Sequence, residues 1–263
     1  MVTRNFLFGL ENDDVLLTRF LETAARVTGF LQGAPGGPLP GWHVPGADNK
    51  KLLSALYGRL EATYPDAGQP FYAVRLLTNL FWQPAYIAVL GTHVHGALPQ
   101  LSRISQQAKG IDVSGFRLAS GPQYKADLDA LILRAGADLR AYADGLLVEI
   151  NELTKLRRVP ALRLLTDRML GLMVRLQQYV PGMTIEEQRR VCGLWLSAMD
   201  LVGQGDLETL DLADGRQVLI TARKGCCLDY LAFPDVYCSS CPKQENSVRL
   251  TRQRDEALAE LDA

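Results

Sequence analysis

The chain has 263 residues, of which 48% are hydrophobic and 22% charged, with a formal net charge of -1. That length can bury a substantial core, and the composition is ordinary for a globular protein. General nucleic-acid binding is not expected, because it calls for a strongly basic face or domain. No long uninterrupted apolar run and no signal-peptide pattern occur, so we expect no transmembrane segment and a cytoplasmic location. Peripheral membrane association is left open.

The N-terminal part predicts two helices joined by a long loop. Apolar residues recur near the helical period over residues 13–30 and 49–61. Between them, residues 32–47 carry repeated prolines and glycines and are expected to be irregular. Trp42 and His43 near the end of this loop are candidates for a ligand site. Packing of the tryptophan against the core is the commoner alternative.

An almost wholly apolar segment follows and is expected in the core. It predicts a helix over residues 70–80, which Pro84 interrupts before it restarts over 86–90, because proline removes a helix hydrogen bond. His93 and His95 come next. Both rings would point to one side of a strand and form a metal pair, whereas on a helix they diverge by about 200°. Ordinary hydrogen bonds at a helix end are expected, with a substrate contact as the alternative.

The pattern differs over residues 101–119, where apolar and polar residues alternate and β-branched residues are frequent. This pattern predicts a β-hairpin. Long helices are then predicted over residues 124–155 and 160–179. A further helix should begin at Thr184, whose threonine and following glutamates form a capping box. Cys192 falls on the apolar side of this last helix and is expected to be a small buried thiol.

The C-terminal part predicts a second hairpin. Residues 207–212 and 217–222 are alternating runs, and Asp214 with Gly215 between them is a strong hairpin signal. The second strand leads directly into a cysteine-rich segment. The mostly polar residues after Pro242 predict a surface helix or a frayed tail.

Together these elements predict an α+β fold that is predominantly α-helical. We expect a helical body with two short β-hairpin regions and a C-terminal cysteine-rich loop. Residues 1–202 would form the body, including the first hairpin and the substrate-binding region. Residues 203–263 would form the second hairpin, the cysteine-rich segment and the tail.

Four of the five cysteines lie close together with the spacing C-C-x10-C-x2-C. They are Cys226, Cys227, Cys238 and Cys241. In a reducing compartment such clustering favours metal or redox chemistry over disulfides, and thiolates suit zinc, copper(I) or iron–sulfur clusters. Adjacent side chains project apart, so the vicinal pair needs a bent backbone to reach one small ion, and Gly225 is placed for such a bend. A wider two-iron cluster relaxes that demand.

The runs from Arg223 to Tyr230 and from Tyr237 to Pro242 resemble the C-terminal signature of the FhuF-like ferric siderophore reductases. The likeness covers about the last fifth of the chain. In that family the four cysteines bind a [2Fe-2S] cluster, and the protein passes one electron to siderophore-bound iron(III). The resemblance thus implies an iron–sulfur oxidoreductase that releases iron(II) from a hydroxamate-type ferric siderophore. The implied cluster and metal ligands are Cys226, Cys227, Cys238 and Cys241.

No dinucleotide-binding glycine motif follows a predicted strand, so we expect an external electron donor such as a ferredoxin or a reductase. Arg223 and Lys224 are candidates for balancing the negative charge of a cluster or for docking an acidic donor, with a solvated strand end as the alternative. Tyr230, Phe233 and Tyr237 would either shield the cluster from water or fill the gap beneath the loop.

Two other classes of protein stay open. One is a zinc-stabilised binding or scaffold protein, in which the cysteines only fold the loop. The other is an iron–sulfur electron carrier without a siderophore, which the large helical body disfavours. Substrate-contacting candidates by residue type alone are Trp42, His43, His93 and the pairs Arg157-Arg158 and Arg189-Arg190.

Overall fold

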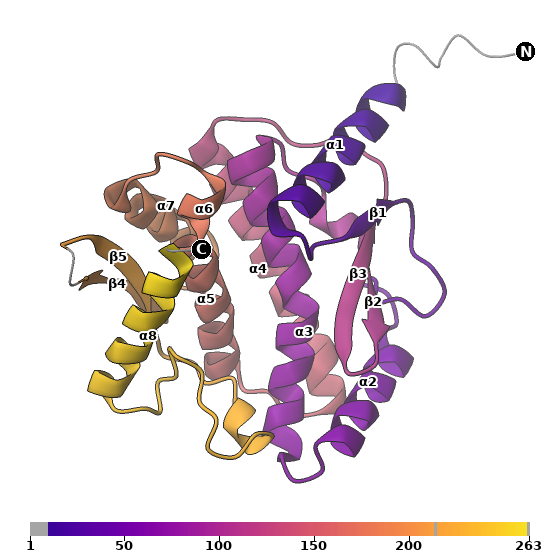
Figure 1. Cartoon of the computed structure of the whole chain (residues 1–263). Coiled ribbons are helices and arrows are strands. Elements are labelled where there is room, and N and C mark those ends of the chain that lie inside the picture. Colours follow the sequence, from indigo (N-terminus) through magenta and orange to yellow (C-terminus); the bar gives the residue numbers. More distant parts are fainter. Residues whose placement is uncertain (1–9, 213–214, 262–263) are drawn as a thin grey trace, which may run out of the picture.

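The computed structural model describes residues 10–212 and 215–261, and helices dominate it (Figure 1). The predicted α+β, mainly helical class is confirmed. The α-helices of the described part are α1 (Leu10–Thr28), α2 (Lys50–Thr63), α3 (Gly68–Leu90), α4 (Leu128–Leu153), α5 (Arg158–Val174), α6 (Leu176–Tyr179), α7 (Ile185–Ala198) and α8 (Asn246–Leu261).

Five strands form two small sheets. They are β1 (Gly33–Pro35), β2 (Ile104–Lys109), β3 (Asp112–Leu118), β4 (Gly205–Asp211) and β5 (Gln217–Arg223). Both predicted hairpins are confirmed: β2 pairs antiparallel with β3, and β4 with β5. Asp214, in the predicted second turn, lies outside the described residues.

The strand β1 corrects the expectation that residues 32–47 are wholly irregular. It runs parallel to β3, with Gly33 opposite Phe116, and completes a sheet of order β1-β3-β2. A Cβ atom at Gly33 would lie 2.2 Å from the Phe116 ring. Glycine therefore lets this loop approach the sheet closely enough to pair with it.

The helix α3 is continuous through Pro84, so the predicted interruption is wrong. Proline leaves the carbonyl of residue i-4, here Leu80, without its helical donor. A side chain from elsewhere replaces that donor: Gln106 Nε2 donates to the Leu80 oxygen at 3.0 Å, and the Tyr142 hydroxyl, which donates to Gln106 Oε1, lies 3.3 Å from the same oxygen. Because the freed carbonyl is hydrogen-bonded, the helix continues to Leu90.

The later helices keep their predicted order with adjusted ends. Asp127 caps α4 by accepting a hydrogen bond from the N–H of Ala130 at 2.9 Å, so this helix begins later than expected. The predicted helix over 160–179 is divided into α5 and α6 at Arg175. Thr184 caps α7 as predicted, and Cys192 on α7 is buried, which raises the pKa of its thiol to about 12.

The two sheets lie on opposite sides of the helical body, as Figure 1 shows. The largely buried helix α3 contacts α4 and α5, and the β4–β5 hairpin packs on α5. The predicted C-terminal helix is confirmed as α8, which places Leu250 and Leu258 against Leu210 and Ile220 of the hairpin. None of the helices in the described ranges combines the length and apolarity needed to cross a bilayer.

Candidate functional site

The cysteine-rich segment leaves β5 and turns sharply after the vicinal pair. The expected bend at Gly225 occurs instead at Leu228, which has a left-handed φ of 61° and leads into a short helical turn, Asp229–Leu231. Gly225 instead allows the segment to approach α5 closely, because a Cβ atom at this position would lie 2.6 Å from Asp167 Oδ2. The bend and the close approach together seat the two cysteines beside α5.

The four clustered cysteines are free thiols that interact with one another. Hydrogen bonds from Cys226 and Cys238 to Cys227 lower the pKa of Cys227 and raise the pKa of both donors. The buried Cys241 acts electrostatically on Cys226 and Cys238. The fold therefore brings together the four thiols that were predicted as a site.

As they stand, no three or more His, Cys, Asp or Glu side chains in the described part are arranged to hold a metal ion. The four thiols do match, in number and chemical kind, the ligand set of one tetrahedral zinc or one two-iron cluster. Binding either group requires the thiols to lose their protons.

Arg223 is the cation that faces the thiols. Its Nη1 lies 3.4 Å from Cys238 Sγ and 3.3 Å from Ser240 Oγ, and its Nε lies 3.0 Å from Asp167 Oδ2. Burial raises the pKa of Asp167 to about 6, although Arg223 opposes that shift. Lys224, which follows the end of β5, points elsewhere and donates to the Gly203 carbonyl at 2.8 Å.

The aromatic residues of the segment pack mainly on one another. Tyr230 and Tyr237 are stacked with ring centroids 5.7 Å apart, and Lys243 Nζ lies 4.9 Å from the Tyr230 centroid. Phe233 makes an edge contact with Tyr64 at 5.5 Å. These contacts fix the shape of the loop and tie it to the helical body.

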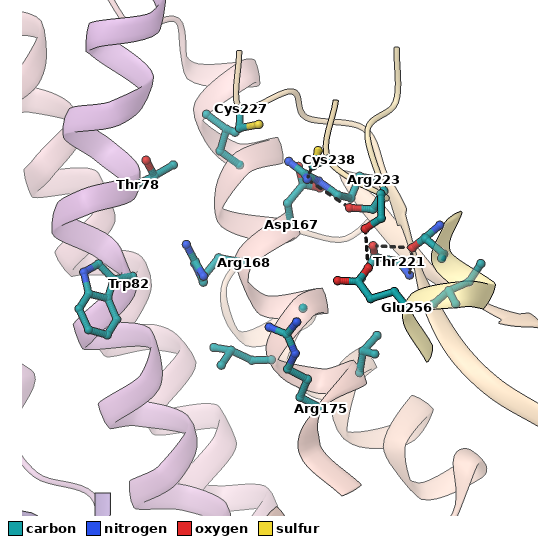
Figure 2. A pocket seen from close by; sticks show the side chains of 18 of the residues that line it. Thr78, Trp82, Asp167, Arg168, Arg175, Thr221, Arg223, Cys227, Cys238 and Glu256 are labelled. Atoms are coloured by element: carbon teal, nitrogen blue, oxygen red, sulfur yellow. Dashed lines mark hydrogen bonds and ion pairs between the residues drawn. The ribbon is translucent and has the colours of Figure 1, made fainter. Parts of the chain in front are cut away.

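A cavity of about 430 Å³ opens beside the thiols. Figure 2 shows its walls: α3 carries Thr78 and Trp82, α5 carries Arg168, Arg175 lies between α5 and α6, and the C-terminal elements face them. Two of the four cysteines, Cys227 and Cys238, are part of the lining. The cavity thus joins elements from both halves of the chain to the cysteine segment.

The cavity lining contains four arginines, and three of them are paired with a carboxylate. The pairs are Arg75 with Asp229 at 2.7 Å, Arg223 with Asp167 at 3.0 Å and Arg175 with Glu260 at 3.1 Å. Within residues 10–212 and 215–261, Arg168 has no hydrogen bond and no ion pair. Its guanidinium is the cation of this cavity that lacks a counter-ion.

The histidine candidates lie away from this cavity. His43 is buried, and its Nε2 lies 3.0 Å from Glu149 Oε2. His93 and His95 lie at a helix end, as predicted, because residues 91–95 form a π-helical turn after α3. His93 accepts a hydrogen bond from Trp195 Nε1 at 2.9 Å, and His95 lies 3.0 Å from Gln123 Oε1.

The basic pairs chosen by residue type are also outside the cavity lining, as is Trp42. Arg158 pairs with Asp144, and Arg190 makes a bidentate contact with Asp129 at 2.8 and 2.9 Å. Arg189 donates to the Leu207 carbonyl at 3.0 Å. These arginines connect helices and strands, whereas the arginines that do line the cavity were missed.

A signal for one missed residue was present in the sequence. Arg75 is the one charged residue between Gly68 and Leu90, a segment that is otherwise apolar or uncharged. A lone charge on a core helix requires a partner or a cavity, because burying an unpaired charge is costly. Arg168 gave no comparable signal, since several charged residues share its helix.

No protein-family model matches the chain, and no solved structure matches it. The likeness to the ferric siderophore reductases therefore rests on the spacing of Cys226, Cys227, Cys238 and Cys241 and on the residues that flank them.

Proposed function

We propose that the protein is a ferric siderophore reductase, with a [2Fe-2S] cluster bound by Cys226, Cys227, Cys238 and Cys241. The observation that carries the proposal is that Cys227 and Cys238 belong to the lining of a cavity of about 430 Å³, a volume typical of small-molecule sites. A cluster on these ligands would supply one electron to iron(III) held in the cavity. The substrate is a ferric siderophore, of the hydroxamate type that the resemblance implies.

The residues around the thiols suit this chemistry. The positive charge of Arg223 stabilises thiolates at Cys238 and Cys227, and its ion pair with Asp167 holds the guanidinium in place. The ion pair between Arg75 and Asp229 ties the segment to α3, and so keeps the cavity wall beside the ligands. Hard oxygen ligands hold iron(II) more weakly than iron(III), so reduction releases the metal into the cytoplasm.

The electron donor in this proposal is a separate protein, a ferredoxin or a reductase. The chain has no glycine-rich dinucleotide motif after a strand that would bind a nicotinamide or flavin cofactor. Such a donor would dock on the exposed part of the cysteine segment. Phe233 and Val236 are exposed there and lie between Cys227 and Cys238 in the sequence.

An anaerobic absorption and EPR spectrum, before and after dithionite, tests the proposal together with iron, sulfide and zinc analysis. We expect visible bands that bleach on reduction, an S = 1/2 signal and two irons per chain, as a [2Fe-2S] centre gives. Turnover of a ferric trihydroxamate should then require the reduced protein. A colourless protein with stoichiometric zinc would contradict the proposal and favour the zinc-stabilised scaffold.

The cysteines of the chain offer a matched pair of variants for the same measurement. Cys227→Ser should lose iron and the visible bands, because it removes one ligand from the centre of the thiol cluster. Cys192→Ala removes a buried thiol on α7 that packs in the core and should keep both. Equal iron content in the two variants would show that the C-terminal cysteines are not the ligands.

A further inference from the structure

Arg168 projects from α5 toward α3 across the cavity, as Figure 2 shows. Arg168 is only partly exposed, and among the described residues it forms no ion pair and no hydrogen bond, although Tyr86 is an electrostatic neighbour. The other three arginines of the lining each have a carboxylate within about 3 Å. A folded chain that pairs three neighbouring guanidiniums and leaves the fourth unpaired has an unused anion-binding group.

The surroundings of Arg168 are electrostatically unfavourable for a cation. Burial lowers the pKa of its guanidinium; Tyr86 opposes that shift, and the charges of Arg223, Arg175 and Arg75 add to it. Keeping a cation there costs folding free energy, because the guanidinium is partly desolvated and no carboxylate among the described residues forms an ion pair with it. A costly group that is retained at a cavity is typical of a binding site.

The cysteines, when deprotonated, are not the counter-ions of Arg168. Cys227 and Cys238 act on Arg223, which also contacts Cys238 directly. In Figure 2, Arg223 stands beside Cys238, while Arg168 turns to the opposite side of Asp167, toward Thr78 and Trp82. An anionic group on a molecule inside the cavity would supply the counter-ion that Arg168 lacks.

We propose that Arg168 binds a carboxylate or another anionic group on the ligand of this cavity, so that the protein prefers negatively charged metal chelates to neutral or cationic ones of the same size. A guanidinium fits a carboxylate through two parallel hydrogen bonds, which gives orientation as well as affinity. The identity of the ligand as an iron chelate rests on the proposed function. The preference for negative charge is a property of the cavity and needs no cluster and no reduction.

Gallium(III) complexes of one linear trihydroxamate test the charge preference by calorimetry on the whole protein. Gallium(III) resembles iron(III) in charge and size but is not reduced under these conditions. The terminal amine of the chelator is left free, acetylated or succinylated, so the same core complex becomes positive, neutral or negative. We expect the succinylated complex to bind about tenfold more tightly than the acetylated one, as one charge-assisted contact provides.

Variants at one position connect the preference to Arg168. Arg168→Gln should abolish the difference between the three complexes, and Arg168→Lys should keep part of it. The control is Arg134→Gln, which removes an arginine from the exposed face of α4, where it pairs with Asp138. The Arg168→Gln variant should melt at or above the temperature of the unmodified protein, because the substitution removes repulsion from three arginines. A marked fall in melting temperature would show a structural role instead.

The outcomes separate this inference from the proposed function. Equal binding of the three complexes overturns the role of Arg168 and leaves the reductase proposal standing. Binding of none of them overturns both. A preference for the succinylated complex that depends on Arg168, in a protein that forms no iron–sulfur centre, supports the anion site and overturns the reductase.

Discussion

His93 is held neutral by its hydrogen bond. Its Nε2 accepts from Trp195 Nε1 at 2.9 Å, so the ring proton must be on Nδ1, which is buried and has no partner among the described residues. Protonation of Nε2 would place two N–H groups against each other. Burial lowers the pKa of His93 from 6.5 to about 4, with Glu187 opposing the shift.

This histidine should make folding pH-dependent. Between about pH 6.5 and 4 the unfolded chain binds a proton at His93 that the folded chain does not. The contribution of neutral His93 to the free energy of unfolding is therefore complete above pH 6.5 and falls as the pH falls. A shift of that size corresponds to at most about 3 kcal/mol. Urea unfolding of the wild type and of His93→Gln at pH 7, 5.5 and 4.5 measures it.

The comparison with His93→Gln is needed because acidic groups titrate in the same range. Asp167 and Asp229 have pKa values raised to about 6, which makes their contribution change in the opposite direction, falling as the pH rises. Glutamine can still accept from Trp195, so the variant removes the titration and keeps the hydrogen bond. Parallel stability curves for the two proteins would contradict the assignment.

At the scale of elements, the continuity of α3 depends on a strand that follows it in sequence. Gln106 of β2 is fully buried; its Nε2 donates to the Leu80 carbonyl and to Gln83 Oε1, and its Oε1 accepts from Tyr142 Oη at 2.5 Å. One glutamine thus joins α3, α4 and the small sheet. The wall of the cavity that carries Trp82 belongs to the same stretch of α3.

Gln106→Leu should destabilise the protein by roughly 1–3 kcal/mol, since it leaves the Leu80 carbonyl and the Tyr142 hydroxyl with fewer partners in a buried place. The matched control is Gln107→Leu on the same strand, where the side chain is exposed and the change should be within about 0.5 kcal/mol. Chemical denaturation measures both. Equal effects would show that the buried network does not support α3.

At the scale of the whole molecule, the candidate site exists only where the C-terminal segment meets the helical body. Gly225 seats the segment on α5, the Arg75–Asp229 ion pair ties it to α3, and α8 closes the far side through the contact of Glu260 with Arg175. The cavity is the space left between these contacts. Its shape should therefore respond to changes that push the segment outward.

Gly225→Ala tests this assembly. The new methyl group would lie 2.6 Å from Asp167 Oδ2 and 3.1 Å from the backbone of Arg163, so the segment must move away from α5. We expect a loss of about 1–3 kcal/mol and a lower iron content per chain. Gly145→Ala is the control, because a methyl group there meets open space on α4 and should stabilise the helix by about 1 kcal/mol. Unchanged iron binding in Gly225→Ala would show that the seating on α5 is not needed.

Local patterns were sufficient to predict most of the helices and both hairpins. The capping residues of α7 and the alternation in β4 and β5 act through neighbours within a few residues, so the sequence alone predicts them. The break expected at Pro84 was wrong because the donor for the Leu80 carbonyl, Gln106 Nε2, comes from 26 residues away. The bend at Leu228, expected at Gly225, likewise depends on how the segment packs on α5.

The sequence by itself determined that this is a mainly helical protein and that four cysteines form the candidate site, because helical periodicity and motif spacing are local properties. Only the tertiary structure decided what stands beside those cysteines. The cavity, its three paired arginines and the unpaired Arg168 bring together α3, α5, β5 and α8, which are distant in sequence. Residues that meet only through packing leave no spacing pattern, so their role followed from the fold.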